Sequence, residues 1–123
     1  LACTGDTIQT NASKDAILPS DGISEGAAFY LGGADPKNPM ASPLYADFEG
    51  FPPVLIQVGT EEILLDDSRR LAARLEEAGV PVVLDIWNKM QHVWQVMSMI
   101  LPEGKQAVEQ IGLFLRTNMR VPK

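Results

Sequence analysis

The chain has 123 residues, of which 46% are apolar, enough to build one domain with a buried core. Its formal net charge is −6, and its Lys and Arg residues form no cluster. A surface for nucleic acid or for an anionic membrane is therefore excluded, because both need grouped positive side chains to neutralise phosphate.

The inventory of residues also argues against several other classes of protein. Cys3 is the lone cysteine, so no disulfide forms within the chain, which favours a reducing, cytoplasmic location. One histidine and one cysteine far apart give no metal-ligand spacing, and no glycine-rich loop follows a strand, so we expect neither metal nor cofactor. No apolar run reaches the ~18 residues of a membrane span. The start at Leu1, without a leader pattern, predicts a soluble piece of a longer protein.

Residues 1–50 are predicted to form a loop-rich segment, because glycine and proline interrupt every stretch that could become a long element. Two short helices are expected within it. One spans about residues 14–18, and the other spans about residues 24–31. Ser24 is the expected N-cap of the second helix, and Gly32 is expected to end it in a left-handed turn.

Residues 51–123 are predicted to form the strand–helix–strand–helix part of one α/β domain. Residues 54–59 are almost continuously apolar and rich in branched side chains, which is typical of a buried strand in a parallel sheet. A helix follows, with its cap supplied by Asp66, Asp67 and Ser68 and its end at Gly79. Residues 82–87 form the second predicted strand, so the unit is a parallel crossover.

The remaining residues are predicted to form a short apolar helix reaching about Leu101 and a last helix from about Glu103 to Asn118. The expected buried stripe of the last helix consists of Ala107, Val108, Ile111, Phe114 and Leu115. Two parallel strands are too few to form a stable sheet. We therefore expect further strands from a missing N-terminal half or from self-association.

Polar residues with catalytic potential follow both predicted strands. Glu61 comes after the first strand and His92 after the second, where open parallel sheets place their ligand sites. A carboxylate that holds one imidazole nitrogen makes the other nitrogen a general base. His92 and Glu61 are therefore a candidate catalytic pair. Spacing alone leaves open that His92 is a surface or capping histidine and Glu61 a solvated loop acid.

A nucleophile is harder to find. Residues 22–26 match the Gly-x-Ser-x-Gly pattern around Ser24, but no strand runs into the turn, as a nucleophile elbow requires. Ser24 is better explained as a helix cap. Asp66 and Asp67 suggest a cation site less strongly than they suggest helix capping. A set of large side chains near His92 would suit either an acyl pocket or a core: Trp87, Met90, Trp94, Met97 and Met99.

Several ordered blocks of sequence, which together cover nearly the whole chain, resemble one family. They are Phe29 to Pro36 (FYLGGADP), Ala41 to Asp47 (ASPLYAD), Pro52 to Gly59 (PPVLIQVG), Leu64 to Ser68 (LLDDS), Met90 to Trp94 (MQHVW) and Leu101 to Ala107 (LPEGKQA). They resemble the C-terminal half of bacterial esterases of the hormone-sensitive lipase family, which are α/β-hydrolases. The resemblance implies an α/β fold with two parallel strands, flanking helices and an incomplete sheet.

The resemblance also implies the function. It makes His92 the catalytic base and places Glu61 where the family usually has aspartate. The extra methylene would shift the carboxylate by roughly 1.5 Å, the length of one carbon–carbon bond. Glu62, Asp66 and Asp67 are the possible substitutes for Glu61.

The family's oxyanion loop and nucleophile elbow are not in this sequence. We therefore expect a fragment of a serine carboxylesterase for short-chain esters that is inactive alone. The alternative is a non-catalytic assembly or binding module that associates through its exposed sheet edge.

Overall fold

The computed structural model describes residues 2–119; Leu1, where truncation is expected, and residues 120–123 lie outside the described residues. The chain forms two compact units, one that ends at His92 and one that begins at Val93. The first unit contains α1 (Thr7–Thr10), α2 (Ser20–Leu31), η1 (Pro43–Tyr45), β1 (Val54–Gly59), α3 (Leu65–Glu77) and β2 (Val82–Trp87). The second unit contains η2 (Trp94–Met97) and α4 (Pro102–Asn118).

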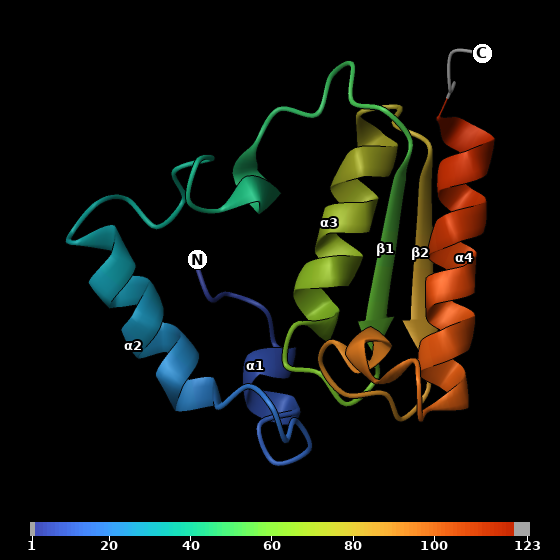
Figure 1. Ribbon diagram of the computed structural model, residues 1–123. Coiled ribbons are helices and arrows are strands. Elements are labelled where there is room, and N and C mark those ends of the chain that lie inside the picture. Colours follow the sequence, from blue (N-terminus) through green and yellow to red (C-terminus); the bar gives the residue numbers. More distant parts are fainter. Residues whose placement is uncertain (1, 120–123) are drawn as a thin grey trace. The chain divides into compact units, whose positions relative to one another are not determined.

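The first unit is built around the parallel pair β1 and β2, whose predicted bounds are confirmed. Val54 lies opposite Val82 and Gly59 lies opposite Trp87, so the two strands pair residue for residue, without a bulge, over all six residues of each. Helix α3 connects the strands and lies alongside both of them (Figure 1). Both strands end at the edge of the sheet near α1, which gathers the loops that follow them at one place (Figure 1).

A small apolar core lies between α3 and the strands. Leu75 of α3 is buried against Phe48 and Val80, and residues of both strands pack around them. Arg74 ties the helix to η1, because its guanidinium donates to the carbonyl of Leu44 at 2.7 Å, and it also lies over the Phe48 ring. The amphipathic pattern of α3 therefore fixes its position on the sheet.

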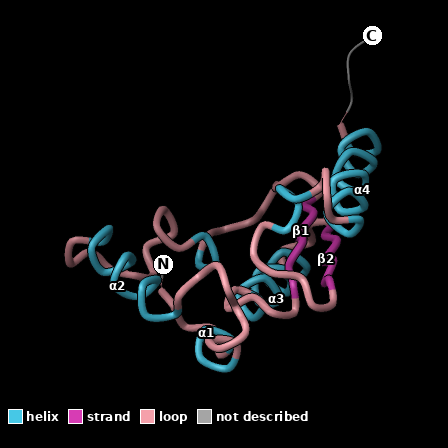
Figure 2. The backbone as a smooth tube through the Cα atoms, turned by 60° about the horizontal axis from the view of Figure 1, so that its bottom comes forward, coloured by secondary structure: helices cyan, strands magenta, loops and turns pink. Residues whose placement is uncertain are grey.

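The strands are less buried than predicted. Val83 is 50% exposed and Ile86 is 38% exposed. Among the described residues, β1 and β2 pair only with each other (Figure 2). A parallel strand becomes fully buried only when layers cover both faces and other strands cover both edges, and two strands cannot provide this.

The predicted helices of the first fifty residues need two corrections. Residues 14–18 form turns and bends, because the Asp15 carboxylate accepts hydrogen bonds from the N–H groups of Ile17 and Leu18 and so competes with helical hydrogen bonds. Helix α2 begins at Ser20, before the predicted start, so Ser24 lies inside it and is not its N-cap. The left-handed end at Gly32, with φ of 53°, is confirmed.

The N-terminus of α3 is not capped as predicted. The helix begins at Leu65, and no side chain of Asp66, Asp67 or Ser68 caps it. Instead, the hydroxyl of Thr7 in α1 accepts from the Asp66 N–H at 2.9 Å and donates to the Ile63 carbonyl at 2.8 Å. The cap is thus supplied from a distant part of the sequence.

The predicted C-terminal turn of α3 is confirmed. Gly79 has φ of 74°, and its N–H donates to the carbonyl of Glu76 at 2.9 Å. The N–H of Val80 donates to the carbonyl of Leu75, also at 2.9 Å. These paired bonds satisfy helix-end carbonyls, as glycine-containing C-terminal turns do.

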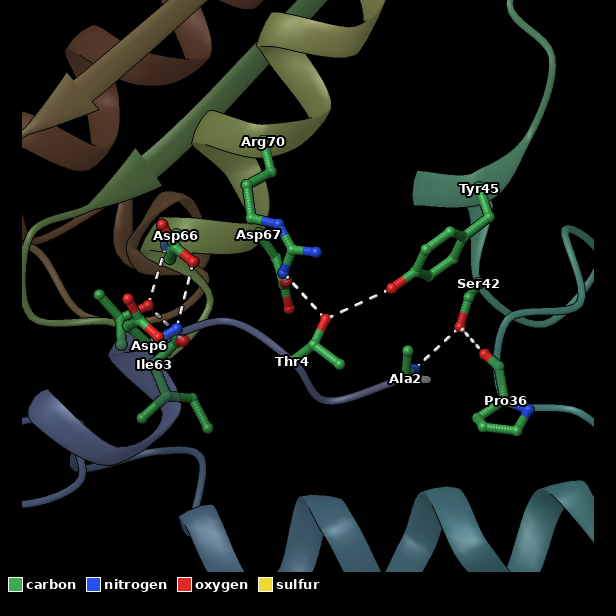
Figure 3. A network of polar contacts seen from close by, with 11 residues as sticks. Ala2, Thr4, Asp6, Pro36, Ser42, Tyr45, Ile63, Asp66, Asp67 and Arg70 are labelled. Carbon is green, nitrogen blue, oxygen red and sulfur yellow. Dashed lines mark hydrogen bonds and ion pairs between the residues drawn. The ribbon is translucent and has the colours of Figure 1, made fainter.

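Polar contacts anchor the N-terminal segment within the first unit (Figure 3). The Thr4 hydroxyl accepts from the Arg70 guanidinium of α3 at 2.9 Å. The N–H of Ala2 donates to the Ser42 hydroxyl at 2.9 Å. The segment therefore contacts both α3 and the loop that precedes η1.

The second unit consists of η2 packed on the first turn of α4. A Cβ at Gly104 would lie 2.9 Å from the carbonyl oxygen of Trp94, so this glycine permits the close approach. The predicted short helix to Leu101 is only the 3-10 turn η2, and α4 begins one residue earlier than predicted.

The stripe predicted for α4 is only partly buried. Ala107 is fully buried, but Val108 is 44% exposed and Leu115 is 45% exposed. The buried positions of α4, Gly104 and Ala107, lie in its first two turns, where η2 packs. Helical periodicity identifies an apolar face but does not guarantee that a partner covers it.

Candidate active site

A carboxylate and an imidazole meet at the carboxyl edge of the sheet. His92 Nδ1 lies 2.8 Å from Glu62 Oε2. Glu62 is in the loop after β1, and His92 is in the loop after β2. The parallel pairing of the strands brings these loops together.

The Glu62 carboxylate is held at both oxygens. Its Oε1 accepts a hydrogen bond from the N–H of Gly59 at 2.7 Å, while Oε2 faces His92. The residue is only 3% exposed. A buried, hydrogen-bonded anion of this kind is fixed in position and resists reorientation.

The predicted contact between Glu61 and His92 is wrong, because Glu62 occupies the position beside the imidazole. The chain turns immediately after β1, where the N–H of Glu62 donates to the carbonyl of Gly59, and this turn directs the second acid inward. Glu61 is half-buried, and its N–H donates to the carbonyl of Met90 at 3.3 Å. The sequence feature that favours Glu62 over Glu61 is Gly59, three residues before Glu62. The N–H of Gly59 is a backbone donor within reach of the Glu62 side chain.

The loops approach each other so closely that only glycine fits at position 59. A Cβ there would lie 2.0 Å from the carbonyl oxygen of Met90. The Thr60 hydroxyl accepts from the N–H of Lys89 at 2.8 Å, and the N–H of Thr60 donates to the carbonyl of Trp87. The backbone of one loop thus sets the position of the other.

Two residues with a left-handed backbone lie near His92 in the sequence. Lys89 has φ of 59°, and Val93, which directly follows His92 and begins the second unit, has φ of 54°. A branched side chain in the left-handed region costs about 1–3 kcal/mol, so the fold must hold it there. Such strain is concentrated at functional sites.

The geometry suits a general base. When Nδ1–H of an imidazole donates to a carboxylate, the tautomer is fixed and the Nε2 lone pair is available to accept a proton. The carboxylate also stabilises the imidazolium that results. Glu62 and His92 have the chemical types, the distance and the burial that this role requires.

The other candidates from the sequence have different roles. Ser24 lies inside α2, and residues 11–19 before that helix contain no strand, so the glycine–serine pattern is not a nucleophile elbow. Asp66 accepts from the N–H of Asp6 at 3.1 Å. Among residues 2–119, no group of three or more His, Cys, Asp or Glu is arranged to hold a metal ion.

Asp67 pairs with Arg70 at 3.3 Å. Burial raises the pKa of the Asp67 carboxyl, and the neighbouring Asp66 charge adds to this, while the Arg70 guanidinium opposes it. This ion pair lies on the first turns of α3, and neither residue hydrogen-bonds to His92.

The large side chains that the sequence suggested for an acyl pocket or a core differ in how far they are buried and in what they contact. Trp94 is 1% exposed and is therefore a buried core residue, which is the alternative given by the sequence. Met99 is 95% exposed. The indole N–H of Trp87 donates to Asp85 at 2.6 Å.

No helix within residues 2–119 has the length and apolar character needed to cross a bilayer.

Comparisons with known proteins agree with this architecture. Residues 2–96 match the family described as alpha/beta hydrolase fold. An acetyl-hydrolase of Streptomyces hygroscopicus is 44% identical over 117 residues, which are 95% of this chain and 39% of that protein. An esterase of Acinetobacter venetianus is 37% identical over 115 residues, covering 93% of this chain and 38% of the relative.

A solved structure of an esterase from the bacterial hormone-sensitive lipase family is also similar. It superposes with a TM-score of 0.92 at 50% identity, over 97% of this chain and 40% of that structure. The chain thus spans about two fifths of the length of these relatives. It belongs to the α/β-hydrolase fold family and corresponds to a partial segment of hormone-sensitive-lipase-type esterases.

Proposed function

We propose that this chain carries the acid–base half of a serine carboxylesterase active site, with His92 as the base and Glu62 as the acid that orients it. The observation that carries the proposal is the 2.8 Å contact between His92 Nδ1 and the buried carboxylate of Glu62. The named relatives are an acetyl-hydrolase and an esterase, which supports short-chain carboxylic esters as substrates of the complete protein.

The reaction follows from the free Nε2 of His92. A serine supplied by another part of the complete protein attacks the ester carbonyl while Nε2 takes the serine proton. The imidazolium then gives that proton to the alcohol oxygen as the ester C–O bond breaks, which leaves the acyl group on the serine. Water, deprotonated by the same nitrogen, attacks the acyl carbonyl, and the imidazolium returns its proton to the serine oxygen as the acyl–serine bond breaks and the carboxylic acid leaves. The Glu62 carboxylate beside Nδ1 stabilises the imidazolium.

The longer acid side chain is compatible with this role. Glu62 contacts His92 with one carboxylate oxygen while the other accepts from the N–H of Gly59 at the end of β1, so the carboxylate of the longer side chain is held at both oxygens. The loop therefore compensates for the length that separates glutamate from the family's usual aspartate. Glu61, the neighbouring acid, offers a matched control.

The test is a chimera in which this chain replaces the matching segment of the 50%-identical esterase, assayed with p-nitrophenyl butyrate. Glu62→Ala should lower kcat/KM by about 10³ to 10⁴, as expected when the acid of a triad is removed. His92→Ala should lower it at least as much, whereas Glu61→Ala should change it less than about threefold. Loss of activity in Glu61→Ala with retention in Glu62→Ala would refute the assignment.

The chain alone should not hydrolyse esters by this mechanism, since Ser24 lies within a helix and not at an elbow. Incubation with p-nitrophenyl acetate should give no burst of p-nitrophenol, and Ser24→Ala should make no difference. A burst that this substitution removes would show that Ser24 is the nucleophile.

A second proposal concerns association. Large apolar side chains are exposed in both units, among them Phe29 at 91% and Met99 at 95%, and the sheet has open edges. We propose that the isolated chain covers these surfaces by self-association or with the remaining part of the protein. Light scattering that returns a monomer over a wide concentration range would contradict self-association.

The lone Cys3 supports a reducing, cytoplasmic location.

A further inference from the structure

Three loops, and not two, meet at the candidate site. The acid loop is residues 59–63, the base loop is residues 89–92, and the third is the turn segment of residues 11–18, which we call the brace. The brace contains two buried polar residues, Asn11 at 4% exposure and Asp15 at 8%. Buried polar side chains in folded proteins almost always make specific hydrogen bonds.

The brace holds the acid loop on both sides of the Glu62 backbone. The Asn11 amide donates to the carbonyl of Thr60 at 3.0 Å and to that of Glu62 itself at 2.8 Å. Asp15 Oδ2 accepts from the N–H of Ile63, the next residue, at 2.9 Å. The backbone that carries the catalytic carboxylate is therefore fixed by side chains of the brace.

The brace also holds the base loop. The side chain of Gln91, directly before His92, accepts from the N–H of Ala16 at 2.8 Å and donates to the carbonyl of Lys14 at 3.0 Å. One short segment thus contacts the loops of both catalytic residues. A shift of the brace would change the distance between them.

The charge of Asp15 fits this position. Burial alone would raise the pKa of its carboxyl, but hydrogen bonds from the backbones of Leu18, Ile63 and Ile17 outweigh it, and attraction to His92 adds to them, so the pKa is lowered. The side chain is therefore an anion at neutral pH. It accepts from the brace with one oxygen and from the acid loop with the other.

We propose that Asp15 is a positioning residue, which locks the brace to the acid loop and thereby sets the Glu62–His92 contact. The inference extends the proposed esterase function, but it has a test that does not need activity. His92 is the only histidine, so the two nitrogen signals of its imidazole are unambiguous in a ¹⁵N spectrum of the chain.

The first experiment compares imidazole ¹⁵N spectra of the folded chain and Asp15→Asn at neutral pH. The unsubstituted chain should show the Nδ1–H tautomer, which the Glu62 contact favours. Asp15→Asn places an NH₂ group or a neutral oxygen against the Ile63 N–H, and it should increase the population of the Nε2–H tautomer severalfold. The control is Asp35→Asn. Asp35 makes a similar local turn by accepting from Lys37 but is exposed, so the spectrum should not change.

The second experiment is a double-mutant cycle in the esterase chimera. Asp15→Asn should lower kcat by about tenfold to a hundredfold with little change in KM, because small misplacements of catalytic groups cost this much. In a Glu62→Ala background the same substitution should have almost no further effect. Independent, multiplied losses would instead indicate a general structural role and overturn the proposal.

Failure of the variant to fold and failure of the chimera to react have separate consequences. If Asp15→Asn does not fold, Gln91→Ala tests the brace at a partly exposed position. A larger population of the Nε2–H tautomer in Gln91→Ala would support the proposal, and an unchanged imidazole spectrum would overturn it. If the unsubstituted chimera is inactive, the esterase proposal fails while the tautomer measurement still decides the role of Asp15.

Discussion

Replacing Gly59 with alanine should separate the catalytic loops. The added Cβ would lie 2.0 Å from the oxygen and 2.5 Å from the carbonyl carbon of Met90, where real contacts stay above 3.0 Å. Both atoms are backbone, so the base loop must recede by about 1 Å. If the movement is transmitted to His92, its distance to Glu62 grows from 2.8 Å to about 3.8 Å, beyond a hydrogen bond.

The expected cost follows from overpacking, which destabilises a protein by about 1–3 kcal/mol. Gly26→Ala is the matched control, because a Cβ there meets nothing within 4 Å and the residue lies inside α2. An alanine in a helix is more stable than a glycine by about 0.5–1 kcal/mol. The same chemical change should therefore lower the free energy of unfolding at position 59 and raise it at position 26.

Urea unfolding followed by far-UV circular dichroism gives both free energies, and imidazole ¹⁵N spectra report whether Glu62 still holds Nδ1–H of His92. In the esterase chimera, Gly59→Ala should also reduce kcat by about a hundredfold, in line with a 1 Å misplacement. The reasoning would be refuted if Gly59→Ala kept the unsubstituted chain's spectrum and unfolded within about 0.5 kcal/mol of it.

Three more predictions concern stability. Gly104→Ala should destabilise the second unit by about 1–3 kcal/mol in urea unfolding, because its Cβ would meet the Trp94 carbonyl at 2.9 Å; an unaltered midpoint would contradict this. The lowered pKa of Asp15 means that its ionised form adds stability above the ordinary value of 3.8, and that this is lost as pH falls through the lower folded-state value. The difference in unfolding free energy between the unsubstituted chain and Asp15→Asn should therefore shrink below about pH 4, and a difference that grew toward acid would disprove it. The raised pKa of Asp67 means that ionisation costs stability above that pKa. Asp67→Asn should therefore raise the free energy of unfolding at pH 7 by less than about 1 kcal/mol, since the side chain is one-third exposed, and should have no effect at low pH; destabilisation at pH 7 would show that the pair with Arg70 dominates.

The sequence by itself determined the elements whose signals are local. Continuous apolar runs predicted β1 and β2 with their correct bounds, because burial and branched side chains act residue by residue. Gly79 and Gly32 marked helix ends, since only a residue without Cβ adopts a positive φ at little cost. His92 after the second strand followed from the placement of ligand sites in parallel sheets.

Only the tertiary structure decided which acid faces the histidine. Glu61 and Glu62 are chemically identical neighbours, and the choice between them depends on a turn closed by Gly59 and on the backbone of Met90 across the sheet edge. The contributions of Asn11 and Asp15 were equally hidden, because they reach residues about fifty positions away. Periodicity and capping rules describe neighbours along the chain, whereas a catalytic contact is set by backbone approaches between segments that the sequence keeps apart.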